Sequence, residues 1–301
     1  LEGTHNLPAN VQVYSLGKEK SAVSKSTYAL RFWKLLRQLR GSYDTVLVHM
    51  NTEYVFLGTS FWRGMKIGLW YNHQAGGWKL ATAARLVDTV FHTSPYAASG
   101  RFKNSRQMPA GIDTEVFKPQ NTSRDADSIY FQGRIARSKR IHILLEAVRL
   151  YRQKAPRAHV DLVGPVENSY VDELKSSFQD LFESGAAQLV GPVPNAQTSV
   201  LYAAHAVSVN LTAAGNFDKS VLESIACGTL AVVSSPAFKG VVPDICFFKE
   251  NDPSSLATTL QNIRALSVEE RAALVEEARN SVMEKHSLKR MAKELHAGFI
   301  S

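Results

Sequence analysis

The chain has 301 residues, of which 45% are hydrophobic and 21% charged, a composition typical of globular proteins and unlike that of disordered ones. No apolar run approaches the roughly 20 residues that cross a bilayer, and Cys227 and Cys246, the only cysteines, lack the spacing of a zinc site or a disulfide framework. A formal net charge of +8 favours anionic partners: nucleotide diphosphates, acidic lipid surfaces or nucleic acid. We therefore expect two lobes and a reducing compartment, the cytoplasm.

Short β-branched or apolar runs alternate with helical patterns, which predicts an α/β protein with parallel sheets. In the first lobe the expected strands are Val11 to Ser15, Thr45 to His49, Lys66 to Tyr71 and Asp88 to Thr93. The stretch from Lys18 to Arg40 has helical apolar spacing and many cations. It is interpreted either as a crossover helix on its own sheet or as a helix that docks on anionic lipid.

The second lobe is predicted to be a complete doubly wound unit. Its expected strands are Ser128 to Gln132, Ala158 to Val163, Ala187 to Val190, Ala206 to Leu211 and Leu230 to Ser234. The first lobe has fewer strands and lacks a glycine-rich turn after an opening strand, so we expect it to be incomplete at its start, as in a trimmed chain. The stretch from Pro109 to Pro119 is linker-like. We place the boundary at Phe117, which divides the chain into residues 1–117 and 118–301.

A basic loop follows the first strand of the second lobe. It runs from Gly133 to Lys139 and leads into a helical pattern from His142 to Arg152. Backbone N–H groups and the dipole of a helix start favour phosphate by about 0.3 to 1 kcal/mol per charge. Arg134 can bind two phosphate oxygens at once, and Lys139 supplies a mobile charge. A solvated basic loop is the alternative.

A second polar loop begins at Gly215 and runs into a short predicted helix near Ser220. The free N–H groups of that helix start can bind phosphate oxygens and sugar hydroxyls. Glu223, on the helix, can accept hydrogen bonds from two ribose hydroxyls. The alternative is that Glu223 is an ordinary carboxylate on the helix surface.

Together these motifs resemble those of the family-4 retaining glycosyltransferases of GT-B fold. That family has a G-R-x4-K loop and, later in the second lobe, an E-x7-E segment that ends in LEAMACG. Here the first motif is Gly133-Arg134 with Lys139, and the second ends in Leu222-Glu223-Ser224-Ile225-Ala226-Cys227-Gly228. The stretch Ala110 to Pro119 is similar to the G-hydrophobic-D-x-x-x-F-x-P segment that joins the family's lobes. The resemblance covers the chain from Thr45 onward.

The resemblance implies two Rossmann-like lobes, with the acceptor on residues 1–117 and the nucleotide sugar on residues 118–301. It implies transfer of a hexose from a nucleotide-diphosphate sugar to a hydroxyl acceptor with retention of configuration. Gly133, Arg134 and Lys139 would bind the diphosphate, and Glu223 the ribose. His73 matches the first-lobe histidine that faces the transferred sugar, whereas a lone histidine after a strand is otherwise more often structural.

The resemblance also suggests residues for the base pocket and for the contact with the donor sugar. The turn after the strand Ala187 to Val190 lines the family's base pocket, so Gly191 and Val193 are candidates; a plain proline-stiffened turn is the alternative. The family's first glutamate of E-x7-E touches the donor sugar, and Gly215 stands in its place here. We hypothesise that Asp218, or the main chain of Asn216 and Phe217, takes over part of this contact beside Ser220.

In the family the acceptor hydroxyl attacks on the face that the diphosphate is leaving, and a phosphate oxygen takes the proton. The resemblance thus implies no protein nucleophile, no metal and no cofactor beyond the nucleotide-sugar co-substrate. No nucleic-acid-binding module is recognisable, so nucleic acid is not an expected partner. The alternative function is a catalytically impaired nucleotide-sugar-binding or partner subunit. The expected location is cytoplasmic, with the basic stretch as a candidate for peripheral contact with an anionic membrane.

Overall fold

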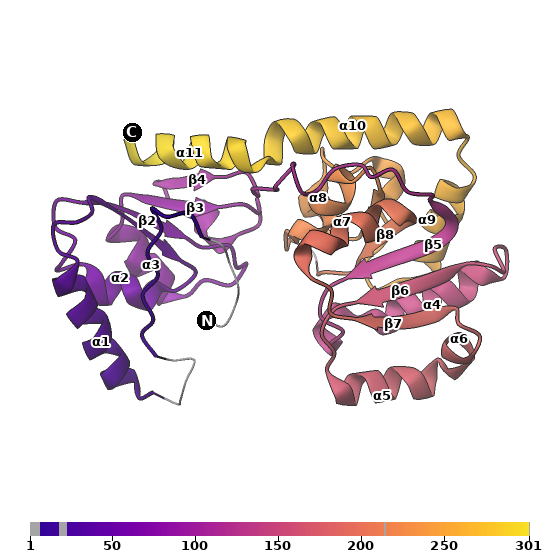
Figure 1. Cartoon of the computed structure of the whole chain (residues 1–301), viewed down its shortest axis with the longest axis horizontal. Helices are drawn as coiled ribbons and strands as arrows, with labels where there is room; N and C mark the ends of the chain where they lie inside the picture. The colour runs from indigo at the N-terminus through magenta and orange to yellow at the C-terminus, as the bar shows by residue number, and fades with distance from the viewer. Residues whose placement is uncertain (1–6, 18–22, 214, 301) are drawn as a thin grey trace.

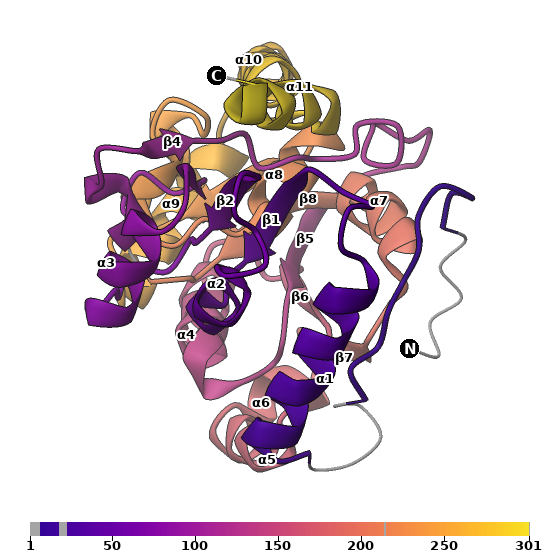
Figure 2. The same ribbon diagram turned by 90° about the vertical axis from the view of Figure 1, so that its left-hand side faces the viewer.

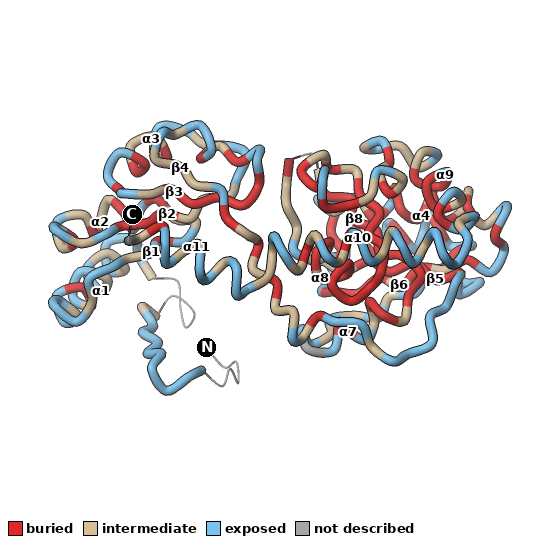
Figure 3. Tube along the Cα trace, turned by 90° about the horizontal axis from the view of Figure 1, so that it is seen from above, coloured by how far each residue is buried: buried red, intermediate tan, exposed pale blue. Residues whose placement is uncertain are grey.

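The computed structural model describes residues 7–17, 23–213 and 215–300, and the helices and strands below keep the labels of Figure 1. The chain forms two α/β lobes side by side, each built on its own parallel sheet (Figure 1). Buried residues gather inside each lobe and form two separate cores (Figure 3). The prediction of an α/β protein with two Rossmann-like lobes is therefore confirmed.

The first lobe has a four-stranded sheet in the order β1-β2-β3-β4. Its strands are β1 (Thr45–His49), β2 (Lys66–Trp70), β3 (Thr89–His92) and β4 (Ser105–Gln107). Its helices are α1 (Lys25–Gln38), α2 (Thr52–Gly58), α3 (Trp78–Arg85) and the 3-10 turn η1 (Ala98–Arg101). Three predicted strands thus lie at the expected places, and the three-residue β4 was not predicted.

The predicted strand from Val11 to Ser15 is wrong. These residues have no regular secondary structure, and Val11, Val13 and Tyr14 are exposed. A strand is stabilised by hydrogen bonds to a neighbouring strand, and within the described residues this segment is paired with none. The alternating pattern therefore identified an extended segment and not a member of the sheet.

The basic stretch forms α1, apart from its first part, since Lys18 and Lys20 lie outside the described residues. Ser24 caps the helix by accepting a hydrogen bond from the Thr27 N–H. Leu36 is buried in the core of the first lobe, and Phe32 of the same helix packs against that core. Helix α1 therefore packs on its own lobe as expected, but it is not a crossover helix, because no strand precedes it in the described part of the chain. No helix in the described part of the chain is long and apolar enough to cross a membrane.

The second lobe has a five-stranded sheet in the order β7-β6-β5-β8-β9. Its strands are β5 (Asp125–Gln132), β6 (His159–Val163), β7 (Ala187–Gly191), β8 (His205–Asn210) and β9 (Leu230–Val233). The connecting helices are α4 (Ile141–Arg152), α5 (Asn168–Ser177), α6 (Gln179–Glu183), α7 (Asn195–Ala204), α8 (Lys219–Ala226) and α9 (Pro253–Arg264), with the 3-10 turns η2 (Arg137–Lys139), η3 (Pro236–Phe238) and η4 (Asp244–Cys246). Every residue of β8 and β9 is buried, as expected for strands covered by helices on both faces.

The two C-terminal helices, α10 (Val268–His286) and α11 (Leu288–Ile300), lie end to end along the top of both lobes (Figures 1 and 2). The Phe299 ring packs against Phe91 of β3 with a centroid distance of 5.5 Å. Arg106 of β4 forms an ion pair with Glu294 at 2.5 Å. The last helix therefore belongs in space to the first lobe, although it follows the second lobe in sequence.

The linker between the lobes is held at the junction of these two helices. Ile112 N–H donates to the His286 carbonyl at 2.8 Å, and Leu288 N–H donates to the Ile112 carbonyl at 2.7 Å. The last first-lobe strand ends at Gln107 and the first strand of the second lobe begins at Asp125. Within this connection the boundary at Phe117 stays a prediction.

Candidate functional site

The candidate site begins where three strands of the second sheet end. The turn after β5 lies against the turn after β6, since Gly133 N–H donates to the Val163 carbonyl at 2.9 Å. A Cβ atom on Gly164 would stand only 2.0 Å from the Gly133 carbonyl oxygen, so no other residue fits at this position. The two turns thereby bring backbone groups together at the carboxyl edge of the sheet, the usual place for ligands in such folds.

The two predicted cations differ in their surroundings. The Arg134 side chain is exposed and makes no hydrogen bond or ion pair with any described residue. Lys139 is 27% exposed, and its Nζ donates to Asp218 Oδ2 at 2.7 Å and to Thr212 Oγ1 at 3.1 Å. Arg134 is thus available to a ligand, whereas the Lys139 ammonium is already partly neutralised.

Asp218 is the acceptor that ties this part of the site together. Its Oδ2 also accepts from Asn210 Nδ2 at 3.1 Å and from the Thr212 hydroxyl. Burial raises the pKa of Asp218, but the Lys139 ammonium and these hydrogen bonds outweigh it and hold the pKa below its ordinary value. The carboxylate therefore stays ionised and anchors Lys139 to the loop after β8.

Helix α8 begins at Lys219, directly after Asp218, as the motif predicted. Ser220 lies in its first turn, and Glu223 is half-buried one turn later. Burial raises the pKa of Glu223, and the nearby Lys219 ammonium and Tyr202 hydroxyl reduce this rise. A half-buried carboxylate on a helix that starts at the site is suited to accept hydrogen bonds from vicinal hydroxyls.

The loop that precedes α8 touches the first lobe. The Gly215 carbonyl accepts a hydrogen bond from Ser94 Oγ at 2.5 Å, and Gly215 N–H donates to Ser235 Oγ at 3.1 Å. The Phe217 ring stacks on Phe238 with a centroid distance of 4.6 Å, so only its main chain remains for a ligand. The carbonyl of Asn216 accepts from the Ser235 hydroxyl.

The remaining predicted residues lie on nearby turns. Gly191 ends β7, and its carbonyl accepts from Gly164 N–H at 2.9 Å. Val193 is half-buried and packs against the core of the second lobe. His73 is exposed on the first-lobe loop after β2, and its carbonyl accepts from Ala98 N–H at 2.9 Å. The fold thus places the predicted second-lobe residues on adjoining turns, with His73 on the opposite lobe.

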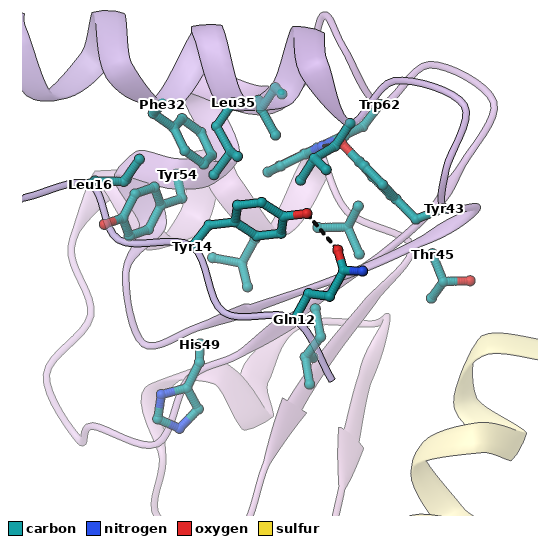
Figure 4. Close-up of a pocket in the computed structure, with 15 residues that line it drawn as sticks. Gln12, Tyr14, Leu16, Phe32, Leu35, Tyr43, Thr45, His49, Tyr54 and Trp62 are labelled. Atoms are coloured by element: carbon teal, nitrogen blue, oxygen red, sulfur yellow. Dashed lines mark hydrogen bonds between the residues drawn. The ribbon is translucent and has the colours of Figure 1, made fainter. Parts of the chain in front are cut away.

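A cavity of about 450 Å³ lies between the lobes. Its walls include Trp70 and Asn72 from the first lobe, Phe217 and Lys219 from the second, and Met291 of α11. A larger cavity of about 760 Å³ lies beside β1 in the first lobe and is lined by aromatic side chains of α1 and its neighbours (Figure 4). On one wall, the Tyr14 hydroxyl donates to Gln12 Oε1, two residues earlier in the same segment. Only the first of these two cavities includes residues next to the predicted site.

The described residues contain no cluster of three histidine, cysteine, aspartate or glutamate side chains able to hold a metal ion. An Asp-x-Asp pattern is present at Asp125 and Asp127, at the amino end of β5, opposite to the edge that carries the site. Asp127 pairs there with Arg157 at 3.1 Å and with Arg264. These carboxylates therefore have a structural role in the second lobe.

The sequence matches one family model over part of the chain, whereas the fold matches solved structures over most of it. Residues 126–265 match the family model described as glycosyl transferases group 1. No curated protein matches the sequence significantly.

Several solved structures share the fold of the whole chain. HepE from Anabaena, solved in complex with UDP, is 15% identical with a TM-score of 0.74, over 89% of this chain and 81% of HepE. Sucrose-phosphate synthase from Thermosynechococcus elongatus is 18% identical with a TM-score of 0.73, over 91% and 79% of the two chains. A glycosyltransferase from Rickettsia africae is 16% identical with a TM-score of 0.76, over 96% and 83%. The GT-B fold expected from the motifs is thus confirmed.

Three residues at the site were not singled out from the sequence. Lys219 is a cation at the first position of α8, and a search for charges at helix starts would have found it. Gln74 and Ser94 contact the Gly215 loop from the first lobe. No sequence signal marks these two, because their proximity to Gly215 depends on how the lobes are placed.

Proposed function

We propose that this protein is a retaining glycosyltransferase that moves a hexose from a nucleotide-diphosphate sugar to a hydroxyl acceptor. The surroundings of Arg134 carry the proposal. Arg134 has no partner among the described residues and lies within the segment that matches the group 1 family model. It stands on the turn beside Lys139 and the start of α8. A structural neighbour, HepE, is solved with UDP and with UDP-glucose, which supports a nucleotide-sugar donor.

In the proposed reaction the bond between the anomeric carbon and the diphosphate oxygen breaks while the acceptor oxygen bonds to that carbon from the same face. The acceptor proton passes to the departing diphosphate. The protein then has to stabilise the developing negative charge and align the acceptor. Arg134 and Lys139 would meet the first need, and His73 would contact the transferred sugar from the opposite lobe.

The donor contacts follow the same geometry. Gly133, Ser220 and the main chain of Asn216 and Phe217 would complete the diphosphate and sugar contacts, and Glu223 would bind the ribose. The turn with Gly191 and Val193 would line the base pocket. The lobe of residues 1–117 would bind the acceptor and that of residues 118–301 the donor. A cytoplasmic location, with the basic face of α1 against an anionic membrane, is part of the same proposal.

A second candidate function is a nucleotide-sugar-binding or partner subunit with impaired catalysis. Two observations favour it: Gly215 provides no side chain at the sugar position, and the Lys139 ammonium is already paired with Asp218. Release of the sugar from a nucleotide-sugar donor by the purified protein would exclude this candidate. Binding of a nucleoside diphosphate without any hydrolysis or transfer would favour it.

The proposed function is tested by removing the Arg134 charge. We expect Arg134→Ala to raise the Kd for UDP or GDP by roughly 10- to 100-fold, because a hydrogen bond to a charged group contributes about 1.5 to 3 kcal/mol. Arg137→Ala is the matched control, since Arg137 lies in the same loop but pairs with Glu173 of α5. Titration calorimetry measures each Kd, after thermal-shift screening against UDP-, GDP- and ADP-sugars identifies the nucleotide.

Lys139 needs a separate design because its removal leaves the Asp218 carboxylate without its cation. Lys139→Met is therefore compared with Lys139→Met/Asp218→Asn, and both are combined with Arg134→Ala. If nucleoside diphosphates bind equally well after both charges are removed, the proposed donor site is wrong. If Arg134→Ala and Arg137→Ala weaken binding equally, the effect comes from the overall charge of the loop.

A further inference from the structure

The cavity between the lobes combines an apolar wall with one cation. Among the described residues that line it, Lys219 is the only lysine or arginine, and none is an aspartate or glutamate. His49, Asn72 and Thr93 supply its other polar side chains, and the apolar wall includes Trp70, Phe217 and Met291. At about 450 Å³ the cavity has the size of pockets that bind small ligands. Such a lining suits a ligand that is partly apolar and carries a negative charge.

The Lys219 ammonium lacks a counter-ion within the described part of the chain. The residue is exposed, and its one hydrogen bond to a described residue is long, 3.4 Å from Nζ to the Gly111 carbonyl of the linker. Asp218, its neighbour in sequence, pairs with Lys139 instead. A cation in the first turn of a helix is also disfavoured by the dipole of that helix. Helix stability therefore does not explain this lysine, whereas a negatively charged ligand in the cavity would.

Asn72 offers hydrogen-bond donors to the same cavity. Its Oδ1 accepts from the N–H groups of Thr93 and Ser94, at 2.9 Å each, in the turn after β3. Because both partners are donors, the side-chain oxygen has to face them, and this fixes the orientation of the amide. The Nδ2 group is bonded to no described residue and stays available. Lys219 from the second lobe and Asn72 from the first thus both present N–H donors to a ligand between them.

The cavity adjoins the proposed donor site but is separate from its diphosphate residues. Arg134 and Lys139 are not among the residues that line it, whereas Phe217 and Lys219, at the start of α8, are. Six further wall residues lie at the carboxyl ends of β1, β2 and β3, in the lobe proposed to bind the acceptor. A negative charge bound in this cavity would therefore belong to the acceptor and not to the donor diphosphate.

We propose that Lys219 and Asn72 bind an anionic group, a phosphate or a carboxylate, on the acceptor; this inference rests on the proposed function. The apolar part of the acceptor would pack against the remaining walls of the cavity. The acceptor would thus be an amphiphilic anion. Its charge would be matched by Lys219, while Arg134 and Lys139 remain with the diphosphate of the donor.

The test uses alkyl probes that differ in their head group: octyl phosphate, octanoate and the neutral octyl glucoside. Titration calorimetry measures the Kd of each probe for the full chain and its variants. We expect Lys219→Met to weaken binding of the preferred anionic probe roughly tenfold, because a charged hydrogen bond is lost. Lys219→Arg keeps the charge and should retain most of the affinity. Lys175→Met is the matched control, since Lys175 is an exposed lysine on α5.

Asn72 is tested by a substitution of nearly equal size. Asn72→Asp keeps an acceptor for the N–H groups of Thr93 and Ser94 but replaces the Nδ2 donors by a negative charge. We expect it to weaken binding of the anionic probe roughly tenfold and to leave octyl glucoside unchanged. Equal weakening of charged and neutral probes would contradict the proposed contact. Thermal unfolding without ligand shows whether each variant is folded.

The outcomes for the probes decide the inference. A preference for octyl phosphate identifies a phosphate and a preference for octanoate a carboxylate, and either supports the proposal. If the unaltered chain binds neither more tightly than octyl glucoside, the anion site is wrong. It is also wrong if Lys219→Met and Lys175→Met weaken binding equally, or if Arg134→Ala abolishes probe binding while Lys219→Met does not.

The Kd values for UDP and GDP separate this inference from the proposed function. We expect Lys219→Met to leave them unchanged. If it weakens nucleotide binding and leaves the anionic probes unaffected, Lys219 belongs to the donor site and the inference is wrong while the proposed function stands. If the unaltered chain binds an anionic probe but no nucleoside diphosphate, the proposed function fails, and with it the assignment of the anion to an acceptor.

Discussion

Gly215 shows how one residue links the chemistry of the site to the contact between the lobes. From the sequence it is a departure from a motif that has glutamate at this position. In the fold, its positive φ and its contact with the end of the Gln74 side chain both disfavour a side chain. A side chain at 215 would therefore have to displace the end of the Gln74 side chain, and its Cβ would stand 3.0 Å from Tyr96 Cβ.

Replacing Gly215 by alanine separates these two effects. We expect Gly215→Ala to lower the free energy of unfolding by about 1 to 2 kcal/mol for the positive φ and by a further amount for the contact with Gln74. Gly41→Ala is the control, because Gly41 has a φ of 81° and nothing within 4 Å of an added Cβ. Urea unfolding measures both variants. Equal losses would show that the Gln74 contact costs nothing.

At the scale of elements, the sequence pattern predicts what an element is more readily than what it packs against. The strands β1 and β9 lie where the apolar runs predicted them. The extended segment from Val11 to Ser15 shows the same alternation but has no neighbouring strand. Helix α11 packs against the first-lobe sheet, and its amphipathic pattern alone does not say which lobe it covers.

The contact of α11 with the first lobe is tested by Phe299→Ala. We expect a loss of about 2 kcal/mol in the free energy of unfolding, because the half-buried ring leaves Phe91 and the space over Gly68 uncovered. Amide hydrogen exchange in β2 and β3 should accelerate more than in β5 and β8. Lys293→Ala, on the exposed side of the same helix, should leave both unchanged. Equal acceleration in all four strands would contradict a contribution specific to the first lobe.

At the scale of the whole molecule, His286 lies where the linker, the site loop and the C-terminal helices meet. Its ring is 5.4 Å from the Phe217 ring, and Nδ1 accepts from Ala110 N–H at 3.3 Å. Burial, with a smaller effect of Lys285, lowers the pKa of His286 to about 4. The neutral imidazole therefore belongs to the arrangement that holds the two lobes together.

This lowered pKa predicts how stability depends on pH. An unfolded histidine has a pKa of about 6.5, so between about pH 6.5 and pH 4 the unfolded chain binds a proton that the folded chain does not. The contribution of His286 is complete above about pH 6.5 and is lost as the pH falls to about 4, by up to about 3 kcal/mol. His286→Gln keeps a hydrogen-bond acceptor and should remove this part of the pH dependence. Parallel urea titrations at pH 7 and pH 4.5 compare the two chains, and identical slopes with pH would contradict the assignment.

The sequence by itself determined the α/β class, the five strands of the second lobe and the motifs with Arg134, Lys139 and Glu223, because these depend on local periodicity and on residues close together in the chain. Only the tertiary structure decided that Lys139 pairs with Asp218, 79 residues away, that Gln74 meets Gly215, and that α11 returns to the first lobe. Such contacts depend on which surfaces bury each other most favourably, and the sequence pattern of one segment does not contain the identity of its partner.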